Sequence, residues 1–321
     1  MDLPVYTSPD DILNATPSHP AQDQYFAMYS SLFSGITTNP KLMSVPLDDH
    51  LVHRGDGVFE GIKMIGGKVY LLDAHLDRLA RSAQAVSLEL RHPGSEIKQI
   101  CKQLANTCQA NDGLFRIYAA RGPGGFSSSP YESIGPQMYI ALTALSQPKE
   151  TAYEKGVSAG YSQIAVKSGG MAQTKTCNYI ANVLMDKEAV DRGIDFMINV
   201  TDAGFLGEGS RANIAYLTAE KDLVYSSFEH TLRGTTLLRV KELSDQLVNA
   251  GLIREMKEDK QLASALAEAT EAMFIGTTID ALPITRLENK AIGNGKPGPV
   301  AMAARKMLVE DQIRGGASFP V

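Results

Sequence analysis

Apolar residues recur along the chain at two different spacings, and each spacing predicts a different kind of element. Over residues 74–88 and 178–192 they fall three and four positions apart, which is typical of an amphipathic helix. Residues 95–111 follow the same pattern, with Ser95 as a candidate N-cap. Further helices are predicted over residues 235–250, 264–274 and 297–313.

Short runs of apolar and aromatic residues between turn residues predict strands. These runs are residues 29–40, 67–73, 114–120, 137–145, 157–166, 195–201, 211–218, 221–226 and 283–292. The helices and strands are mixed in order, and no GxGxxG segment follows a predicted strand. The predicted fold class is therefore α+β, with mixed or antiparallel sheets, and not a dinucleotide-binding unit.

A polar stretch near the middle, "SQPKETAYEKG", predicts a division of the chain. A length of 321 residues is enough for about two domains, each with its own core. We expect a small N-terminal α+β domain over residues 1–146, of which 1–25 form an extended arm. A linker follows at residues 147–157, and residues 158–321 form a larger cofactor-binding domain.

Composition limits the classes of function. The net charge is −5, so the chain carries no general electrostatic preference for nucleic acid or an anionic membrane. No stretch approaches the roughly 18 apolar residues of a membrane span. The three cysteines include no CxxC pair, which argues against a disulfide framework and fits a cytoplasmic location. His50 and His53 have no third ligand near them in sequence, so we expect no metal site.

Several segments combine chemically useful side chains with apolar or small neighbours. Lys175 stands directly before a predicted helix, Glu208 lies between two glycines, and Arg78 lies on an amphipathic helix. Taken singly, these are an ordinary loop lysine, turn carboxylate and surface arginine. The turns "RGTT" and "IGTT" add backbone N–H groups and hydroxyls that can hold an anion. Together the set suits a cofactor with an aldehyde and a phosphate.

These segments resemble the fold-type IV pyridoxal-phosphate enzymes, which include branched-chain aminotransferases, D-amino-acid aminotransferases and aminodeoxychorismate lyases. The resemblance covers residues 29–292 and rests on "HRGDGVFEG", "KTCNYIANVLMDKEAVDRG", "GEGSRANI", "LRGTT" and "GTTIDALPI". "VPLDDHLVHRGDGVF" and "GPGGF" are most similar to the plastid-type branch of D-amino-acid transaminases and lyases. The resemblance implies pyridoxal 5′-phosphate as cofactor, small amino acids and 2-oxo acids as substrates, and a homodimer.

The same resemblance assigns roles to individual residues. Lys175 matches the catalytic Schiff-base lysine, Glu208 the carboxylate on the pyridine nitrogen, and Arg78 the phosphate arginine. The remaining cofactor contacts it implies are Tyr179, Thr235, Thr236 and Thr277, and the expected substrate contacts are Phe59, Thr277 and Thr278.

The sequence also departs from the family pattern. Ala215 stands where the family usually has an aromatic residue, and Leu237 where arginine is common. The loop at residues 121–130 lacks the Arg-x-His carboxylate trap of some D-amino-acid enzymes and resembles the lyase version.

Glu60, within "GVFEGIK", resembles the transaminase version of its segment. We therefore expect an aminotransferase acting on a branched-chain or similar amino acid. The alternatives are an aminodeoxychorismate lyase, a D-amino-acid aminotransferase and a non-catalytic relative that binds the cofactor.

Overall fold

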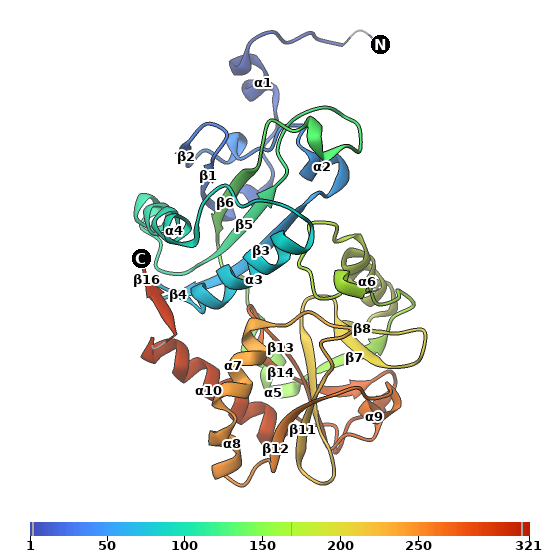
Figure 1. Ribbon diagram of the computed structural model, residues 1–321. Coiled ribbons are helices and arrows are strands. Elements are labelled where there is room, and N and C mark those ends of the chain that lie inside the picture. The colour runs from blue at the N-terminus through green and yellow to red at the C-terminus, as the bar shows by residue number, and fades with distance from the viewer. Residues whose placement is uncertain (2, 168, 316) are drawn as a thin grey trace.

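The computed structural model describes residues 1–321 except residues 2, 168 and 316. In this part of the chain, strands form one seven-stranded and one nine-stranded sheet, and helices pack on both. Figure 1 shows the first sheet above the second, with the N-terminal arm at the top. The combination of helices with antiparallel and mixed sheets confirms the predicted α+β class.

The first sheet is antiparallel, in the order β16-β4-β3-β5-β6-β1-β2. Its central pair places Phe59 opposite Tyr118 and Gly61 opposite Arg116. The strands, in chain order, are β1 Tyr25–Ser30, β2 Gly35–Thr37, β3 Gly57–Ile65, β4 Lys68–Tyr70, β5 Gly113–Ala120, β6 Gln137–Thr143 and β16 Ser318–Pro320.

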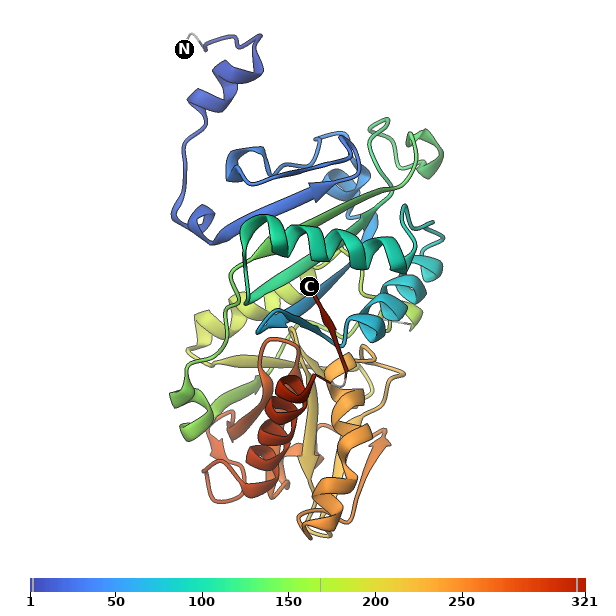
Figure 2. The ribbon, with the colours of Figure 1, turned by 90° about the vertical axis from the view of Figure 1, so that its left-hand side faces the viewer.

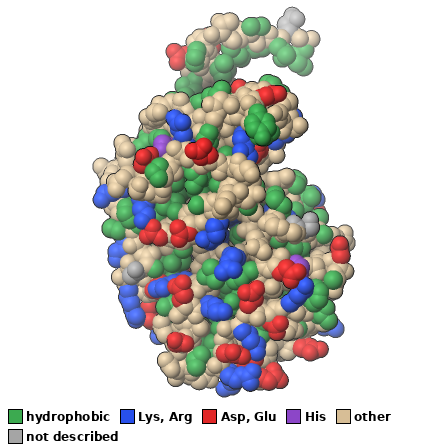
Figure 3. Space-filling view, in the orientation of Figure 1, with side chains coloured by type: hydrophobic (Ala, Val, Ile, Leu, Met, Phe, Trp, Pro, Cys, Tyr) green, Lys and Arg blue, Asp and Glu red, His purple; other side chains and the backbone are tan. Residues whose placement is uncertain are grey.

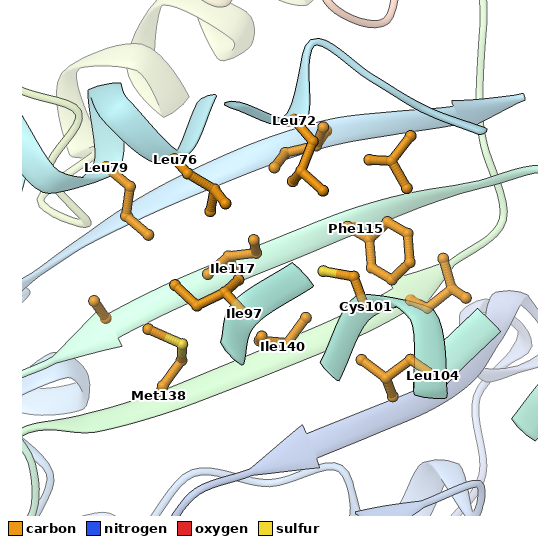
Figure 4. Close-up of a cluster of buried hydrophobic side chains, with 14 of the residues drawn as sticks. Leu72, Leu76, Leu79, Ile97, Cys101, Leu104, Phe115, Ile117, Met138 and Ile140 are labelled. Carbon is orange, nitrogen blue, oxygen red and sulfur yellow. The ribbon is translucent and has the colours of Figure 1, made fainter. Parts of the chain in front are cut away.

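Two helices, α3 (Leu72–Ala85) and α4 (Gly94–Cys108), cover one face of this sheet. Figure 4 shows their leucine, isoleucine and cysteine side chains packed against Phe115, Ile117 and Ile140 of the strands. Leu79 and Leu104 are fully buried there, and each such side chain stabilises the fold by about 1.5–3 kcal/mol. This core fixes α3, which also carries the buried Arg78.

The second sheet is mixed, in the order β12-β11-β10-β13-β14-β7-β8-β9, with β15 paired to β14. Its β11–β12, β14–β7 and β7–β8 pairs are parallel. The strands are β7 Val157–Tyr161, β8 Phe196–Val200, β9 Leu206–Gly209, β10 Asn213–Leu217, β11 Asp222–Ser226, β12 Glu255–Asp259, β13 Glu271–Gly276, β14 Asp280–Leu287 and β15 Lys290–Ala291.

The remaining helices are mostly associated with the second sheet. Buried residues of α7 and α10 share one apolar cluster with β10, β11 and β13. Met185 and Ala189 of α6 pack against Met197 of β8. The helices not yet given are α1 Pro9–Ala15, α2 His50–Arg54, α5 Glu150–Lys155, α6 Ile180–Arg192, α7 Thr235–Leu243, α8 Asp245–Asn249, α9 Ser264–Ala267 and α10 Pro299–Arg314.

The helix predicted over 264–274 is wrong in its second half. Residues 271–276 form β13, which pairs with β10 and β14 and is largely buried. Their alanine, glutamate and methionine favour helix weakly, and pairing on both sides overrides that preference. The helix predicted over 235–250 is interrupted at Ser244, whose hydroxyl donates to the Lys241 carbonyl. Ser95 is not an N-cap, because α4 already begins at Gly94 after Pro93.

The chain crosses between the sheets more than once. The arm expected to be extended contains α1, and the expected linker contains α5. The last strand, β16, returns to the first sheet and pairs with β4. The predicted boundaries at residues 146 and 158 stay a prediction, but residues 318–320 lie with the N-terminal sheet.

The surface carries both signs of charge. In Figure 3 basic and acidic side chains are interspersed over the visible face, with basic ones at its middle. In the described part of the chain, no helix is both long and apolar enough to cross a membrane.

Candidate active site

A cavity of about 480 Å³ lies between the two sheets. Strands β3 and β5 supply one wall, and residues 208–213, 232–236 and 275–278 supply the other. The site residues predicted from the sequence all line it, although they come from distant parts of the chain: Phe59, Arg78, Lys175, Tyr179, Glu208, Thr235, Thr236, Thr277 and Thr278. Their individual roles stay predictions.

Lys175 is held in place by backbone pairing with the edge of β3. Its carbonyl accepts from the Phe59 N–H at 3.0 Å, and Thr176 forms a β-bridge with Val58. The Lys175 N–H donates to the Ser82 hydroxyl of α3 at 3.2 Å. Its Nζ lies 4.5 Å from the centre of the Phe59 ring and 5.5 Å from that of Tyr179. The backbone of Lys175 is therefore fixed while its amine reaches into the cavity.

The surroundings of Lys175 favour its free amine. Burial, helped by the positive charge of Arg78, lowers the pKa of Lys175 to about 8. The negative charges of Glu60 and Glu208 oppose this shift without cancelling it. With such a pKa roughly a tenth of the amine is free and nucleophilic at neutral pH, far more than in an ordinary lysine.

Glu208 faces the same cavity from strand β9. Burial raises the pKa of its carboxyl to about 7, against a hydrogen bond from the Leu232 N–H at 3.1 Å. Asn213 Nδ2 donates to the same oxygen, Oε2, at 3.3 Å, and Asn199 Oδ1 accepts from the Glu208 N–H at 2.8 Å. The carboxyl is thus oriented by its neighbours and ready to pair with a cationic group inside the cavity.

Arg78 is oriented by Glu60, a buried residue of β3. The Nε and Nη2 atoms of Arg78 donate to the two Glu60 oxygens at 2.7 Å each, a bidentate geometry. Although burial alone would raise it, the charge of Arg78 lowers the pKa of Glu60 to about 2. Nη1 donates to the Arg233 carbonyl at 3.3 Å, which places the guanidinium beside the turn that leads into α7.

His75 extends this network to α7. Its Nδ1 lies 2.7 Å from Glu60 Oε2, and its Nε2 lies 3.1 Å from Thr235 Oγ1. Burial lowers the pKa of His75, so the neutral ring is favoured despite the opposing charge of Glu60. A neutral ring that donates through Nδ1 must accept through Nε2, so the Thr235 hydroxyl is the donor. Strand β3, α3 and α7 are thereby connected through buried polar groups.

The start of α7 offers groups that could hold an anion at one end of the cavity. Thr235 and Thr236 are buried there, and among the described residues no side chain caps the first N–H groups of the helix. A Cβ at Gly234 would lie 1.9 Å from Asn213 Oδ1, so only glycine fits this close approach. The positive end of the helix, these hydroxyls and Arg78 therefore converge on one place.

Aromatic rings form the opposite wall. Phe59 and Tyr118 stack with their ring centres 6.0 Å apart, and Phe59 meets Tyr179 edge-on at 5.1 Å. The Tyr179 hydroxyl donates to the Ser210 carbonyl at 3.3 Å. The wall is broad, apolar and suited to cover a flat ring or an apolar side chain.

The donor set fits pyridoxal phosphate. A lysine amine, a buried carboxyl and a helix N-terminus with an arginine match an aldehyde, a pyridine nitrogen and a phosphate, respectively. Gly234, whose missing Cβ leaves room for Asn213 Oδ1, lies directly before the N–H groups of this helix start.

Sequence reasoning missed three contributors to the site. Arg116 of β5 lines the cavity opposite Gly61, and its place between apolar strand residues was the available signal. His75 lies three residues before Arg78, a spacing that puts both on one helix face. Asn213, which donates to Glu208, follows it by five residues across a turn, so no periodic pattern links them.

Two further side chains of types common in active sites differ in their position. Tyr131 is 95% exposed and does not line the cavity. Cys177 lines it, but burial raises the pKa of its thiol to about 12, so it stays protonated.

Comparison with known proteins agrees with this geometry. The family described as amino-transferase class IV matches residues 57–287. The chain belongs to this family. The family implies pyridoxal phosphate as the cofactor, and it makes the chain an aminotransferase, as predicted.

Two relatives and one solved structure are similar to this chain over most of its length. A chloroplastic D-amino-acid transaminase of Arabidopsis thaliana is 37% identical over 299 residues, 93% of this chain and 79% of the relative. A D-alanine aminotransferase of Bacillus licheniformis is 28% identical, over 86% of this chain and 95% of the relative. The solved branched-chain amino acid aminotransferase of Escherichia coli has a TM-score of 0.82 at 21% identity, over 89% of this chain and 94% of that chain. This last likeness shows the fold, fold type IV.

Proposed function

We propose that this aminotransferase binds pyridoxal phosphate in the cavity between the sheets and uses Lys175 as its covalent anchor. The observation that carries the proposal is the convergence of Lys175, Glu208 and the Arg78–α7 anion site on one cavity. Phosphate is held by Arg78 and by the N–H groups and hydroxyls of Thr235 and Thr236. Glu208 pairs with the ring nitrogen.

The bound cofactor would supply an electrophilic carbon and a ring that accepts electrons. Lys175 Nζ would hold the cofactor and, as a free amine once substrate is bound, would accept the proton that leaves the substrate α-carbon. Glu208 keeps a proton on the ring nitrogen, and Phe59 and Tyr118 exclude water from one wall. The outcome is exchange of an amino group between an amino acid and a 2-oxo acid.

For the substrates, we propose D-amino acids as donors and 2-oxo acids, including dicarboxylic ones, as acceptors. The 37% identity to a D-amino-acid transaminase supports the stereochemistry. Arg116 supports the acceptor, because its exposed guanidinium lines the cavity and makes no ion pair with a described carboxylate. Branched-chain L-amino acids are the second candidate, supported by the aromatic wall of Phe59 and Tyr118.

Single-turnover measurements with the loaded enzyme test these assignments. D-Alanine, D-glutamate, L-leucine and L-glutamate are added separately without acceptor, and conversion of the cofactor to its amine form is followed by absorbance. We expect conversion with D-amino acids and reversal by 2-oxoglutarate. Conversion by L-leucine alone would favour the second candidate. No conversion, together with 4-aminobenzoate formed from aminodeoxychorismate, would make the enzyme a lyase.

The anchor is tested by borohydride reduction of the loaded enzyme and peptide mapping. We expect the label on Lys175, and Lys175→Ala to abolish turnover while leaving a folded protein. Lys167 is the sharpest competitor, because its Nζ lies 4.9 Å from the centre of the Tyr179 ring. A label on Lys167 would contradict the assignment.

We also propose that the enzyme is a homodimer. The outer face of α6 carries apolar side chains at helical spacing, all more than 40% exposed: Ile180, Val183, Leu184 and Val190. Exposed apolar residues also mark the loop between β5 and β6: Phe126, Tyr131 and Ile134. Such exposure suits a surface covered by a second copy.

A further inference from the structure

The turn between β13 and β14 contributes Gly276, Thr277 and Thr278 to the cavity and ends at Asp280. Asp280 has a positive φ of 49°, a conformation that aspartate and asparagine adopt more readily than most residues. It pairs with Gly276 across the hairpin, so its position fixes where the turn closes.

Asp280 is almost fully buried and is held from two other segments. Its Oδ1 accepts from the Lys63 ammonium of β3 and from Gln312 Nε2 of α10, the latter at 2.8 Å. Lys63 is 1% exposed and Asp280 3%. A buried pair of this kind is costly to break from one side, because the remaining charge loses its partner.

Lys63 connects this pair to the opposite wall of the cavity. Alternate residues of a strand share a face, so Lys63 lies on the same side of β3 as Phe59 and Gly61, which line the cavity. On one face of β3, Phe59 and Gly61 thus form the cavity wall, and Lys63, two residues after Gly61, binds Asp280 at the end of the turn. The separation between the wall and the turn is therefore set by a direct ion pair.

The residue before Asp280 is held as well. The Ile279 carbonyl accepts from the Tyr153 hydroxyl of α5 at 3.1 Å. The guanidinium of Arg305, from α10, lies 3.6 Å from the centre of the Tyr153 ring and pairs with Glu150. The turn is thus supported by α5, α10 and the first sheet, through side chains that do not themselves line the cavity.

We propose that Asp280, clamped by Lys63 and Gln312, is a positioning residue that sets the Gly276–Ile279 turn for the substrate carboxylate. This inference rests on the proposed function and on the expectation from the sequence that Thr277 and Thr278 contact substrate. Neutralising the clamp lets the turn move relative to β3, so substrate affinity falls while the chemistry at Lys175 continues.

The test compares Asp280→Asn, Lys63→Met/Asp280→Asn, Lys63→Arg and Gln312→Met with a matched control, Asp311→Asn. Asparagine preserves the positive φ at position 280, and the double variant leaves no unpaired buried charge. Asp311 also joins the sheets, through Tyr70 at 2.6 Å and Arg239 at 2.7 Å, but contacts nothing in the turn. For each variant, KM, kcat, the dissociation constant of the cofactor and Tm are measured with the loaded enzyme.

We expect KM for the 2-oxo acid to rise more than about tenfold in Asp280→Asn and the double variant, with kcat within about threefold. Gln312→Met should raise KM less, and Lys63→Arg, which keeps charge and donors, should keep KM near that of the natural protein. Asp311→Asn should lower Tm and leave KM unchanged.

Equal KM in Asp280→Asn and Asp311→Asn would overturn the inference, and so would a double variant whose KM is that of the natural protein. If Lys63→Met/Asp280→Asn does not fold, Gln312→Met decides, because it removes one bond to Asp280 Oδ1 without unpairing a buried charge; an unchanged KM in that variant would then overturn the inference. Absence of amino transfer by the natural chain itself would count against the proposed function instead.

Discussion

In water Lys175 is positively charged and Glu208 negatively charged. In the cavity the pKa of each side chain shifts in the direction that favours its uncharged form. Burial lowers the pKa of Lys175 to about 8 and raises that of Glu208 to about 7. Each pKa unit corresponds to about 1.4 kcal/mol, so at neutral pH Glu208 is roughly half ionised and roughly a tenth of Lys175 is free amine. Such values are typical of groups that exchange protons with a ligand.

The rate of cofactor capture should depend on pH through Lys175. The rate at which the cofactor-free protein captures pyridoxal phosphate should rise by about tenfold per pH unit and level off above about pH 8. The reason is that only the deprotonated amine of Lys175 attacks, and protons compete for it below its pKa. Stopped-flow absorbance between about pH 6 and 10 measures this rate. A rise that continued to the ordinary lysine pKa of 10.5 would contradict the lowered pKa.

Glu208→Gln should slow the reaction without weakening the binding of the cofactor. The amide keeps the size of the side chain and can still accept from the Leu232 N–H, but it cannot neutralise a protonated ring nitrogen. We expect the half-reaction rate to fall by on the order of 100-fold while the dissociation constant of the cofactor changes little. Single-turnover rates and equilibrium titration measure the two quantities. A variant that lost affinity but kept its rate would reverse the assignment.

Arg78→Lys should mainly weaken the binding of the cofactor. Lysine retains the charge but cannot make the bidentate contact with Glu60, so the cation is no longer aimed at the start of α7. Loss of one charge-assisted contact is worth about 1.5–3 kcal/mol, which predicts cofactor binding weaker by roughly 10- to 100-fold. Equilibrium dialysis measures the loss. Unchanged affinity would show that Arg78 does not hold the phosphate.

At the scale of elements, the site depends on how closely α7 approaches the strand β10. Gly234 precedes α7 and fits against Asn213 of β10, and the same asparagine donates to Glu208 and to the Leu232 carbonyl. A shift of α7 would therefore disturb the anion site and the carboxyl together. This links two parts of the cavity that face different ends of the cofactor.

Gly234→Ala tests this close approach. Its φ is −66°, so alanine causes no backbone strain, and the effect is purely steric, from a Cβ 1.9 Å from Asn213 Oδ1. We expect cofactor affinity to fall at least about tenfold, equivalent to about 1.4 kcal/mol. Gly170→Ala is the control, because a Cβ there meets no described atom within 4 Å. Equal affinities in the two variants would exclude the steric explanation.

At the scale of the whole molecule, the cavity exists only because the two sheets meet. Its walls belong to different sheets, and β16, the Lys63–Asp280 pair and the Asp311–Tyr70 bond connect them. Neither sheet alone carries a complete site. Conditions that loosen the contact between the sheets should therefore reduce activity before either core unfolds.

The natural protein is expected to be a homodimer. The outer face of α6 is apolar and exposed in the single chain, so we expect light scattering to give twice the chain mass of 34.6 kDa. Val183→Asp/Val190→Asp, on that face, should shift the mass toward the monomer. Arg192, also on α6 but ion-paired with Glu188, provides the control Arg192→Gln, which should leave the dimer intact. An active monomer in the natural protein would contradict the prediction.

The kind of reaction and most of the helices and strands could be predicted from the sequence. Helical and strand periodicity located α3, α4, α6 and α10, and the motifs around Lys175, Glu208 and Arg78 named the residues that the structure brings to one cavity. These features are local, since a periodic apolar face or a lysine before a helix is written in a few neighbouring residues.

The remaining features could not be predicted in this way, because they depend on contacts between residues far apart in sequence. Pairing with β10 and β14 made a strand of residues 271–276 against their helical composition. Glu60, His75 and Thr235 became one network, in which His75 and Thr235 are 160 residues apart, and Lys63 met Asp280 across 217. Burial, which shifts the pKa values of Lys175 and Glu208, is likewise a property of the packed sheets and not of any segment.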